Sequence, residues 1–118
     1  MHRFKELKVW NESMLLSKEV YRYCRMLPDH ERYGLISQIQ RSAVSISSNI
    51  AEGSGRDSKK SFSYFIQIAI ASSFELETQL LLSKDIYTEV NDDKYNKLCT
   101  HLTVVQKMLV NFRKYLFK

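Results

Sequence analysis

The amino-acid sequence predicts an all-α fold, an antiparallel up-down-up-down four-helix bundle. Apolar residues recur at steps of three and four along nearly the whole chain, which is the period of an amphipathic helix. Glycine and proline are scarce, three and one among 118 residues, so few positions interrupt a helix. The interruptions divide the chain into four segments with short connections, and short connections make successive helices antiparallel. We therefore expect a single four-helix-bundle domain over residues 1–118.

The first two helices are predicted over residues 7–26 and 31–52. The first ends before Pro28, which cannot continue a helix. Its main apolar stripe is Leu7, Trp10, Met14, Tyr21 and Cys24, widened by Val9, Leu16, Val20 and Leu27. The seam of the second is Leu35, Ile39, Ser42, Ile46, Asn49 and Gly53. Gly53 and Gly55 are expected to end the second helix in left-handed conformations.

The third and fourth helices are predicted over residues 58–85 and 92–116. Ser58 is a good N-cap for the third, and Asp92 and Asp93 lie in the first turn of the fourth, where the helix dipole favours anions. The seam of the third is Phe62, Phe65, Ala69, Ser73, Leu76, Leu80 and Ser83. The fourth has the most regular seam, at Tyr95, Leu98, Leu102, Val105, Leu109, Phe112 and Leu116.

The third helix carries more apolar residues than one bundle face can bury. A second apolar set lies beside its seam: Ile66, Ile68, Ile70, Phe74, Leu81 and Leu82. A helix that is apolar nearly all round is normally covered on both sides, and exposed apolar patches usually mark an interface. We therefore expect the chain to self-associate.

Charge is segregated along the chain. The net charge is +5, but residues 61–91 hold four acidic residues and one basic residue, while residues 107–118 hold four basic residues and no acidic one. The apolar stretch at residues 62–82 is interrupted by glutamates, which makes it too polar for a membrane span. With no apolar signal region at the first residues, the chain is expected to be cytoplasmic, and Cys24 and Cys99 are expected to be reduced.

Several polar residues lie in or beside the seams of the second and third helices. They could form a buried network across this helix pair, with Arg41 or Arg56 neutralising an acid, or they could face solvent at the end of the bundle. The candidates are Asn49, Glu52, Ser73, Glu75 and Glu77. A phosphate-binding turn at residues 52–56 is a weaker possibility than a helix-ending turn, because the lysine–hydroxyl spacing of a P-loop is absent.

No pattern indicates catalysis, a metal or a cofactor. The histidines at positions 2, 30 and 101 are scattered, and no Glu-x-x-His occurs, which excludes the usual di-iron constellation of helical bundles. Cys99 and His101 are two residues apart on a helix and diverge. We therefore expect that the protein is not an enzyme.

Four blocks of sequence resemble a known family. They are Phe4-x-x-Leu7-x-Val9-Trp10, Pro28-x-x-Glu31-x-Tyr33-Gly34-Leu35-x-x-Gln38, Arg41-Ser42-Ala43-x-Ser45-Ile46-x-x-Asn49-Ile50-Ala51-Glu52-Gly53 and Glu75-Leu76-Glu77-x-x-Leu80. The chain resembles the four-helix-bundle proteins encoded in intervening sequences of bacterial 23S ribosomal RNA genes, a family that includes accessory proteins of diversity-generating retroelements. The resemblance implies a ring-shaped homopentamer and a link to RNA.

The resemblance and the basic residues together suggest a non-catalytic scaffold that binds RNA or another nucleic acid. The candidate nucleic-acid-binding residues are Arg3, Lys5, Lys8, Arg41, Arg56, Lys59, Lys60, Lys107, Arg113, Lys114 and Lys118. The alternative is a protein-binding adaptor, for example an accessory subunit of a reverse transcriptase or ribonucleoprotein, with no direct nucleic-acid contact. A product with no defined ligand also remains open. The aromatic residues are assigned to helix seams, so no aromatic surface among the cations is expected.

Overall fold

The computed structural model describes residues 3–118 and consists of four long helices. They are α1 (Lys8–Cys24), α2 (Leu35–Ser54), α3 (Lys59–Ile86) and α4 (Asp92–Tyr115). Short 3₁₀ turns, η1 (Phe4–Glu6) and η2 (Asp29–Glu31), precede α1 and α2. The all-α four-helix fold predicted from the sequence is confirmed.

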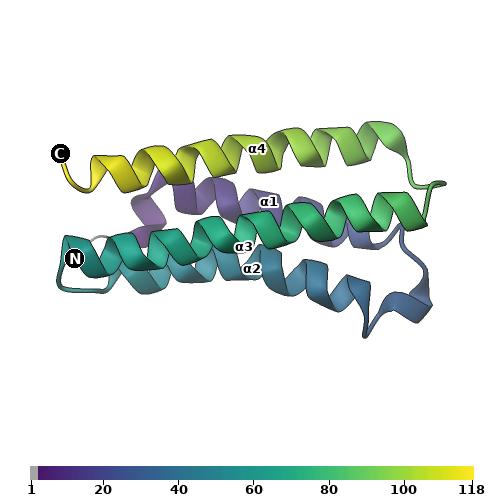
Figure 1. The fold of residues 1–118 in the computed structure, drawn as a ribbon, viewed down its shortest axis with the longest axis horizontal. Helices are drawn as coiled ribbons and strands as arrows, with labels where there is room; N and C mark the ends of the chain where they lie inside the picture. Colours follow the sequence, from purple (N-terminus) through teal and green to yellow (C-terminus); the bar gives the residue numbers. More distant parts are fainter. Residues whose placement is uncertain (1–2) are drawn as a thin grey trace.

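The helices form a bundle of 45 × 25 × 20 Å in which each helix packs against two neighbours. The neighbouring pairs are α1 with α2, α2 with α3, α3 with α4, and α4 with α1, so α1 and α3 lie diagonally across the core. Figure 1 shows the start of α1, the end of α4 and the α2–α3 turn at one end of the bundle, and the other two connections at the opposite end. This is the up-down-up-down order.

The start of α2 differs most from its predicted position. The helix begins at Leu35 rather than residue 31, because residues 29–31 form η2 and the Glu31 side chain then caps α2. Glu31 Oε1 accepts a hydrogen bond from the Leu35 backbone N–H at 3.1 Å, which satisfies one of the free amides at the helix start. At the starts of α3 and α4, Ser58 and Asn91 act as N-caps, accepting from the backbone N–H groups of Ser61 and Lys94.

The prediction that Gly53 and Gly55 adopt left-handed conformations is wrong, because no glycine in residues 3–118 has a positive φ. Gly53 lies inside α2, where its role is steric. A β-carbon at this position would lie 2.8 Å from Phe62 Cδ1 and 2.8 Å from Phe65 Cβ of α3. The glycine therefore permits close packing of α2 against α3.

The core follows the predicted seams in α4 and shifts by one position in α1. The fully regular seam of α4 is buried at Tyr95, Leu98, Leu102, Val105, Leu109 and Leu116. In α1 the buried residues are Val9, Ser13, Leu16, Val20, Tyr23 and Cys24, and Leu27 is buried just after the helix. Met14 and Tyr21 flank these residues, and Tyr21 is 45% exposed. The small Ser13 fits the seam because its hydroxyl donates to the Val9 carbonyl at 2.7 Å within the helix.

The outer face of α3 leaves large apolar side chains in solvent, as its sequence indicated. Phe74, Leu81, Leu82 and Ile86 are each about half exposed, at 56%, 52%, 48% and 53%. By length and composition alone, α3 is also the one helix in residues 3–118 that reaches the hydropathy of a membrane span, which differs from the sequence-based expectation. Core helices of soluble bundles reach the same values, so this is weak evidence.

Candidate nucleic-acid interface

One end of the bundle gathers most of the predicted basic residues. α1 starts there, α2 ends there, α3 starts there and α4 ends there (Figure 1). Residues 3–8, 52–60 and 111–118 therefore meet at this end, bringing nine basic and three acidic side chains. The nine, which define the basic end, are Arg3, Lys5, Lys8, Arg56, Lys59, Lys60, Arg113, Lys114 and Lys118.

Two arginines of the basic end are held against the bundle. Arg113 Nε donates to Ser63 Oγ at 3.0 Å, and its Nη2 lies 3.3 Å from Gln67 Oε1. Arg56 pairs with Glu52 at 2.7 Å and lies 4.7 Å from the centroid of the Phe65 ring. These contacts hold the end of α4 and the α2–α3 turn against the first turns of α3. They therefore fix the relative positions of the chain segments that form the basic end.

The lysines of the basic end are free for an external anion. Lys5, Lys8, Lys59, Lys60, Lys114 and Lys118 are all exposed, and none of them forms an ion pair within residues 3–118. Lys59 and Lys60 occupy the first turn of α3, whose N-terminal dipole is already positive. The two lysines therefore add to a local field that attracts anions and repels cations.

Exposed aromatic rings lie among these cations, a feature that the sequence analysis missed. Tyr64, Tyr115 and Phe117 are 60%, 62% and 60% exposed. Tyr64 lies within about two turns of the start of α3, and the other two lie at the end of α4, so all three belong to the basic end. None of the three is among the predicted seam residues, so their position off the seams was the sequence signal that could have found them.

Two predicted nucleic-acid residues lie apart from the basic end. Lys107 is about two turns before the end of α4. Arg41 is in the middle of α2, where it lines a polar groove of about 480 Å³ between α2 and α3 together with Glu75 and Gln79. The structure therefore does not join Arg41 to the other cations.

The predicted polar residues of α2 and α3 do not form one network in the structure. Asn49 Nδ2 donates to the Ser45 carbonyl of its own helix at 2.8 Å, and Ser73 Oγ donates to the Ile70 carbonyl at 2.6 Å. Short side chains in a helix readily bond the preceding turn in this way. Glu77 Oε1 instead accepts from Gln106 of α4 at 2.8 Å.

The remaining members of that set are separate as well. Glu75 is exposed in the α2–α3 groove, and Glu52 forms an exposed pair with Arg56 of the following turn. The bonds that cross between α2 and α3 are made by other residues, and Asn49 reaches them only through its donation to Ser45 Oγ at 3.0 Å. Ser45 Oγ lies 2.8 Å from Ser72 Oγ, and Ser42 Oγ donates to Gln79 Oε1 at 2.7 Å.

The described residues offer no metal centre or reactive thiol. No group of three or more His, Cys, Asp or Glu side chains within residues 3–118 is placed to hold a metal ion. Burial raises the pKa of the Cys24 thiol to about 12, which keeps it in the unreactive protonated form. His101 of α4 lies between two carboxylates of α1, with Nδ1 2.8 Å from Glu19 Oε1 and Nε2 3.2 Å from Glu12 Oε1. Its imidazole therefore links α4 to α1.

Comparison with known proteins places this fold in a family. The model of the 23S rRNA-intervening sequence protein family matches residues 5–111. The chain belongs to this family. A search of curated proteins found no match. Among solved structures, a protein of unknown function from the S23 ribosomal protein family of Bacteroides thetaiotaomicron is 24% identical, with a TM-score of 0.77 over 90% of this chain and 98% of that chain. That likeness supports the four-helix fold.

The Tyr33-Gly34-Leu35 block has a structural role in this 23S rRNA-intervening sequence protein. A β-carbon at Gly34 would lie 2.8 Å from Glu31 Oε1, the atom that caps α2. Glu31 Oε2 in turn accepts a 2.5 Å hydrogen bond from the Tyr87 hydroxyl. This bond lowers the pKa of Glu31 and raises that of Tyr87. Glu31 therefore joins the α1–α2 and α3–α4 connections, and Gly34 leaves room for its carboxylate.

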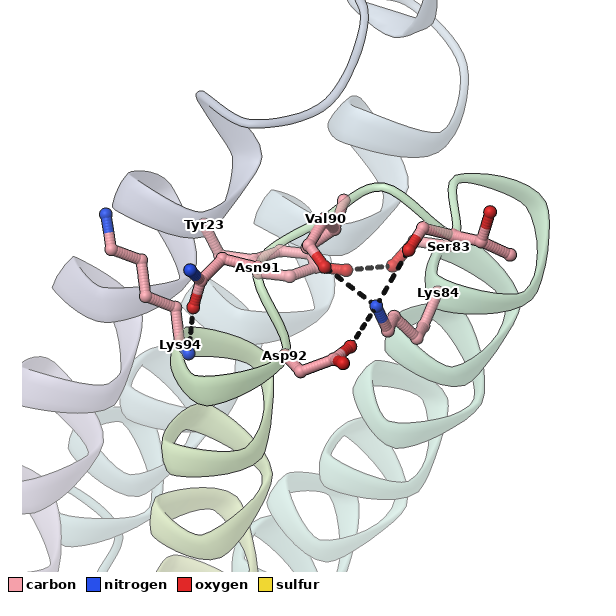
Figure 2. Close-up of polar contacts among 8 residues, drawn as sticks. Tyr23, Ser83, Lys84, Val90, Asn91, Asp92 and Lys94 are labelled. Atoms are coloured by element: carbon pink, nitrogen blue, oxygen red, sulfur yellow. Dashed lines mark hydrogen bonds and ion pairs between the residues drawn. The ribbon is translucent and has the colours of Figure 1, made fainter.

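A lysine closes the α3–α4 connection at the same end of this family member. Figure 2 shows Lys84 of α3 reaching across the turn to Val90 and Asp92. Lys84 Nζ donates to the Val90 carbonyl at 2.7 Å and to the Thr88 carbonyl at 3.1 Å, and it lies 2.5 Å from Asp92 Oδ1. Lys84 is therefore occupied within the chain, unlike the lysines of the basic end.

Proposed function

We propose that this 23S rRNA-intervening sequence protein is a non-catalytic, self-associating bundle that binds RNA or another nucleic acid in the cytoplasm through its basic end. The observation that carries the proposal is the convergence of nine basic side chains from three separate chain segments on one end. Phosphate contacts supply most of the sequence-independent affinity for nucleic acids, and several unpaired lysines on one surface are suited to make them.

The exposed aromatic rings support nucleic acid as the ligand. Tyr64, Tyr115 and Phe117 stand among the cations with more than half of their surface in solvent. Bases of single-stranded segments stack on such rings, at about 1–3 kcal/mol per base, whatever their sequence. A structured RNA with unpaired loops therefore fits this surface better than a uniform duplex, because RNA recognition commonly uses splayed-out bases.

Self-association would strengthen the binding. The half-exposed apolar residues on the outer face of α3 support an interface between copies, since apolar side chains gathered on an exposed face often mark one. The homopentameric ring implied by the family resemblance would carry five times the +5 charge of one chain. Repeated weak contacts to one phosphate backbone then add through avidity.

The test is a titration of labelled, structured RNA over a series of salt concentrations. We expect the logarithm of the binding constant to fall linearly with that of the salt concentration, because bound cations displace counterions. The variant Lys59→Glu with Lys114→Glu should lower affinity at least about tenfold, because it removes two phosphate contacts and adds repulsion. Arg113 is left intact because it holds α4 against α3.

The matched control is Arg32→Glu with Lys94→Glu, which changes the net charge equally at the opposite end of the bundle. It should bind RNA nearly as the unmodified protein does. Equal losses in the two variants would mean that only net charge matters, and absence of binding at low salt would reject the proposal.

The second candidate is a protein-binding adaptor, favoured by the exposed apolar face of α3. The adaptor is supported instead if this protein does not bind RNA and still recovers a protein partner in a pull-down after nuclease treatment. An acidic protein partner would use the basic end in that case.

A further inference from the structure

A small cleft opens between α1 and α4, where α1 ends and α4 begins. Figure 1 shows that this half of the bundle is the one away from the basic end. The volume of the cleft is about 260 Å³. Its lining on the α1 side covers residues 19–26, which is about 10 Å at the helical rise. The residues that define this α1–α4 cleft are Glu19, Arg22, Tyr23, Met26, Lys94 and Leu98, and Lys97 lines it as well.

The floor of the cleft is apolar. Tyr23 and Leu98 are 3% and 2% exposed, so the packing of the core fixes both side chains. Figure 2 shows the Tyr23 hydroxyl directed to Ser83 of α3, at 2.6 Å, so Tyr23 offers the cleft its ring and not its polar atom. Met26 is partly buried, and its flexible thioether can adapt to the shape of an occupant. The floor therefore suits an apolar group.

The size of the cleft limits that group to a small one. An apolar cavity of about 150 Å³ in another protein binds benzene. The α1–α4 cleft, at about 260 Å³, therefore has room for an aromatic ring system or an acyl chain of medium length. It is too small to enclose a larger ligand, because sites for drug-sized molecules span about 300–1,000 Å³.

Two cations beside this floor are free to bind an external anion. Neither Arg22 nor Lys94 forms an ion pair with any residue in the described part of the chain. Both side chains are exposed, and Figure 2 shows that of Lys94 extending beside α1. A guanidinium can donate two parallel hydrogen bonds to a carboxylate, and an ammonium adds a second positive charge.

The other charged residues of the cleft are already paired. Lys97 Nζ lies 3.2 Å from Asp93 Oδ2. Glu19 Oε1 lies 2.8 Å from His101 Nδ1. The Glu19 carboxylate still repels a second negative charge nearby, so the cleft favours an anion with one charge over one with two.

We propose that the α1–α4 cleft binds a small organic carboxylate with an apolar body, either an aryl group or a medium-length acyl chain. The body lies on Tyr23, Met26 and Leu98, and the carboxylate lies between Arg22 and Lys94. An apolar cleft with a few convergent polar groups is the usual form of a small-molecule site. The inference goes beyond the proposed function, because the cleft shares no residue with the basic end.

The test follows the backbone amide NMR signals of the protein during titrations with octanoate and with 2-naphthoate. We expect saturable shifts centred on residues 19–26 and 94–98. Acetate has the head without the body, and octanol has the body without the charge. Each should bind at least about tenfold more weakly than octanoate, because each lacks half of the interaction. Tighter binding of octanoate assigns the body as an acyl chain, and tighter binding of 2-naphthoate assigns it as an aromatic ring.

A pair of matched variants tests the role of the two cations. Arg22→Gln with Lys94→Gln removes both free charges and should weaken octanoate binding at least about tenfold. The control, Arg32→Gln with Lys107→Gln, makes the same change in net charge at residues that do not line the cleft, and it should leave octanoate binding unchanged. All four residues are exposed, so both variants are expected to fold, which thermal melts check.

The outcomes separate this inference from the proposed function. No saturable shift with either carboxylate overturns the inference, as do shifts centred on the outer face of α3 or on the basic end. Octanol that binds as tightly as octanoate, or equal losses in the two variants, overturns it too. RNA titrations are independent of these results. The Arg22→Gln, Lys94→Gln chain should bind RNA nearly as the unmodified protein does, and the Lys59→Glu, Lys114→Glu chain should keep its octanoate binding.

Discussion

Gly53 lies at a close contact between α2 and α3, and its replacement by alanine gives a sharp test of the packing. A β-carbon at position 53 would lie 2.8 Å from Phe62 Cδ1 and 3.3 Å from Phe62 Cε1. The Phe62 ring can rotate away, but Phe65 Cβ, also 2.8 Å distant, is fixed to the α3 backbone. Gly53→Ala therefore has to push the two helices apart.

Two opposing effects set the size of the change in the free energy of unfolding. Alanine has the higher helix propensity, which favours the variant by about 0.8–1.0 kcal/mol. Overpacking a filled core costs about 1–3 kcal/mol. The second effect prevails because one of the two closest atoms cannot move without the backbone. Because Phe65 Cβ is fixed, the overpacking cost should lie in the upper part of its range, about 2–3 kcal/mol, so we expect Gly53→Ala to lower stability by about 1–2 kcal/mol.

Urea unfolding followed by circular dichroism measures this change, with Gly55→Ala as the control. Gly55 has a φ of −86°, and a β-carbon there would meet only the Glu52 carbonyl at 3.6 Å, an ordinary contact. Gly55→Ala is expected to leave stability unchanged or to raise it by up to about 1 kcal/mol, since alanine restricts the unfolded chain. A Gly53→Ala protein as stable as the unmodified one would refute the account of the α2–α3 contact.

Two further predictions concern the end of the bundle that holds Lys84 and Glu31. Lys84→Met removes charged hydrogen bonds to two carbonyl groups and should cost about 1–3 kcal/mol in urea unfolding, with faster amide exchange at residues 87–91. Lys97→Met, which removes only an exposed pair with Asp93, should stay within about 1 kcal/mol. The pKa of Glu31 is lowered in the fold, mainly by Tyr87, so this contact stabilises the protein above the carboxyl's unfolded pKa and is lost as pH falls through the folded pKa. Tyr87→Phe should raise the Glu31 pKa in an NMR titration and flatten the acid side of the stability profile, and an unchanged pKa would contradict this.

The parts of the fold that local periodicity specifies were predictable from the sequence. The seam of α4 has apolar residues at every expected step, and all but the partly buried Phe112 are buried. The stripe of α1 was misplaced by one position because Ser13 occupies a core position where an apolar residue is expected. The start of α2 could not be predicted either. Its cap, Glu31, is held by Tyr87, 56 residues further along the chain.

The polar seam residues show a different limit. Their sequence positions place Asn49 and Ser73 at the α2–α3 contact, but each can bond the carbonyl one turn earlier in its own helix. This local bond needs no partner helix and no added ordering, so it is favoured over a bond across the pair. Periodicity assigns a residue to a face, but it does not distinguish these two partners.

The basic end follows from topology more than from any single motif. Its cations lie at the start of α1, around the α2–α3 turn and at the end of α4. In an up-down-up-down bundle these three places coincide at one end, so the charges converge however long the helices are. Shortening one helix by a turn would move its cations by only about 5 Å. Inverting the order of two helices would separate them by the length of the bundle. The candidate interface is therefore as well determined as the up-down order itself. Arg41 belongs to a different surface because it lies in the middle of its helix, away from the basic end.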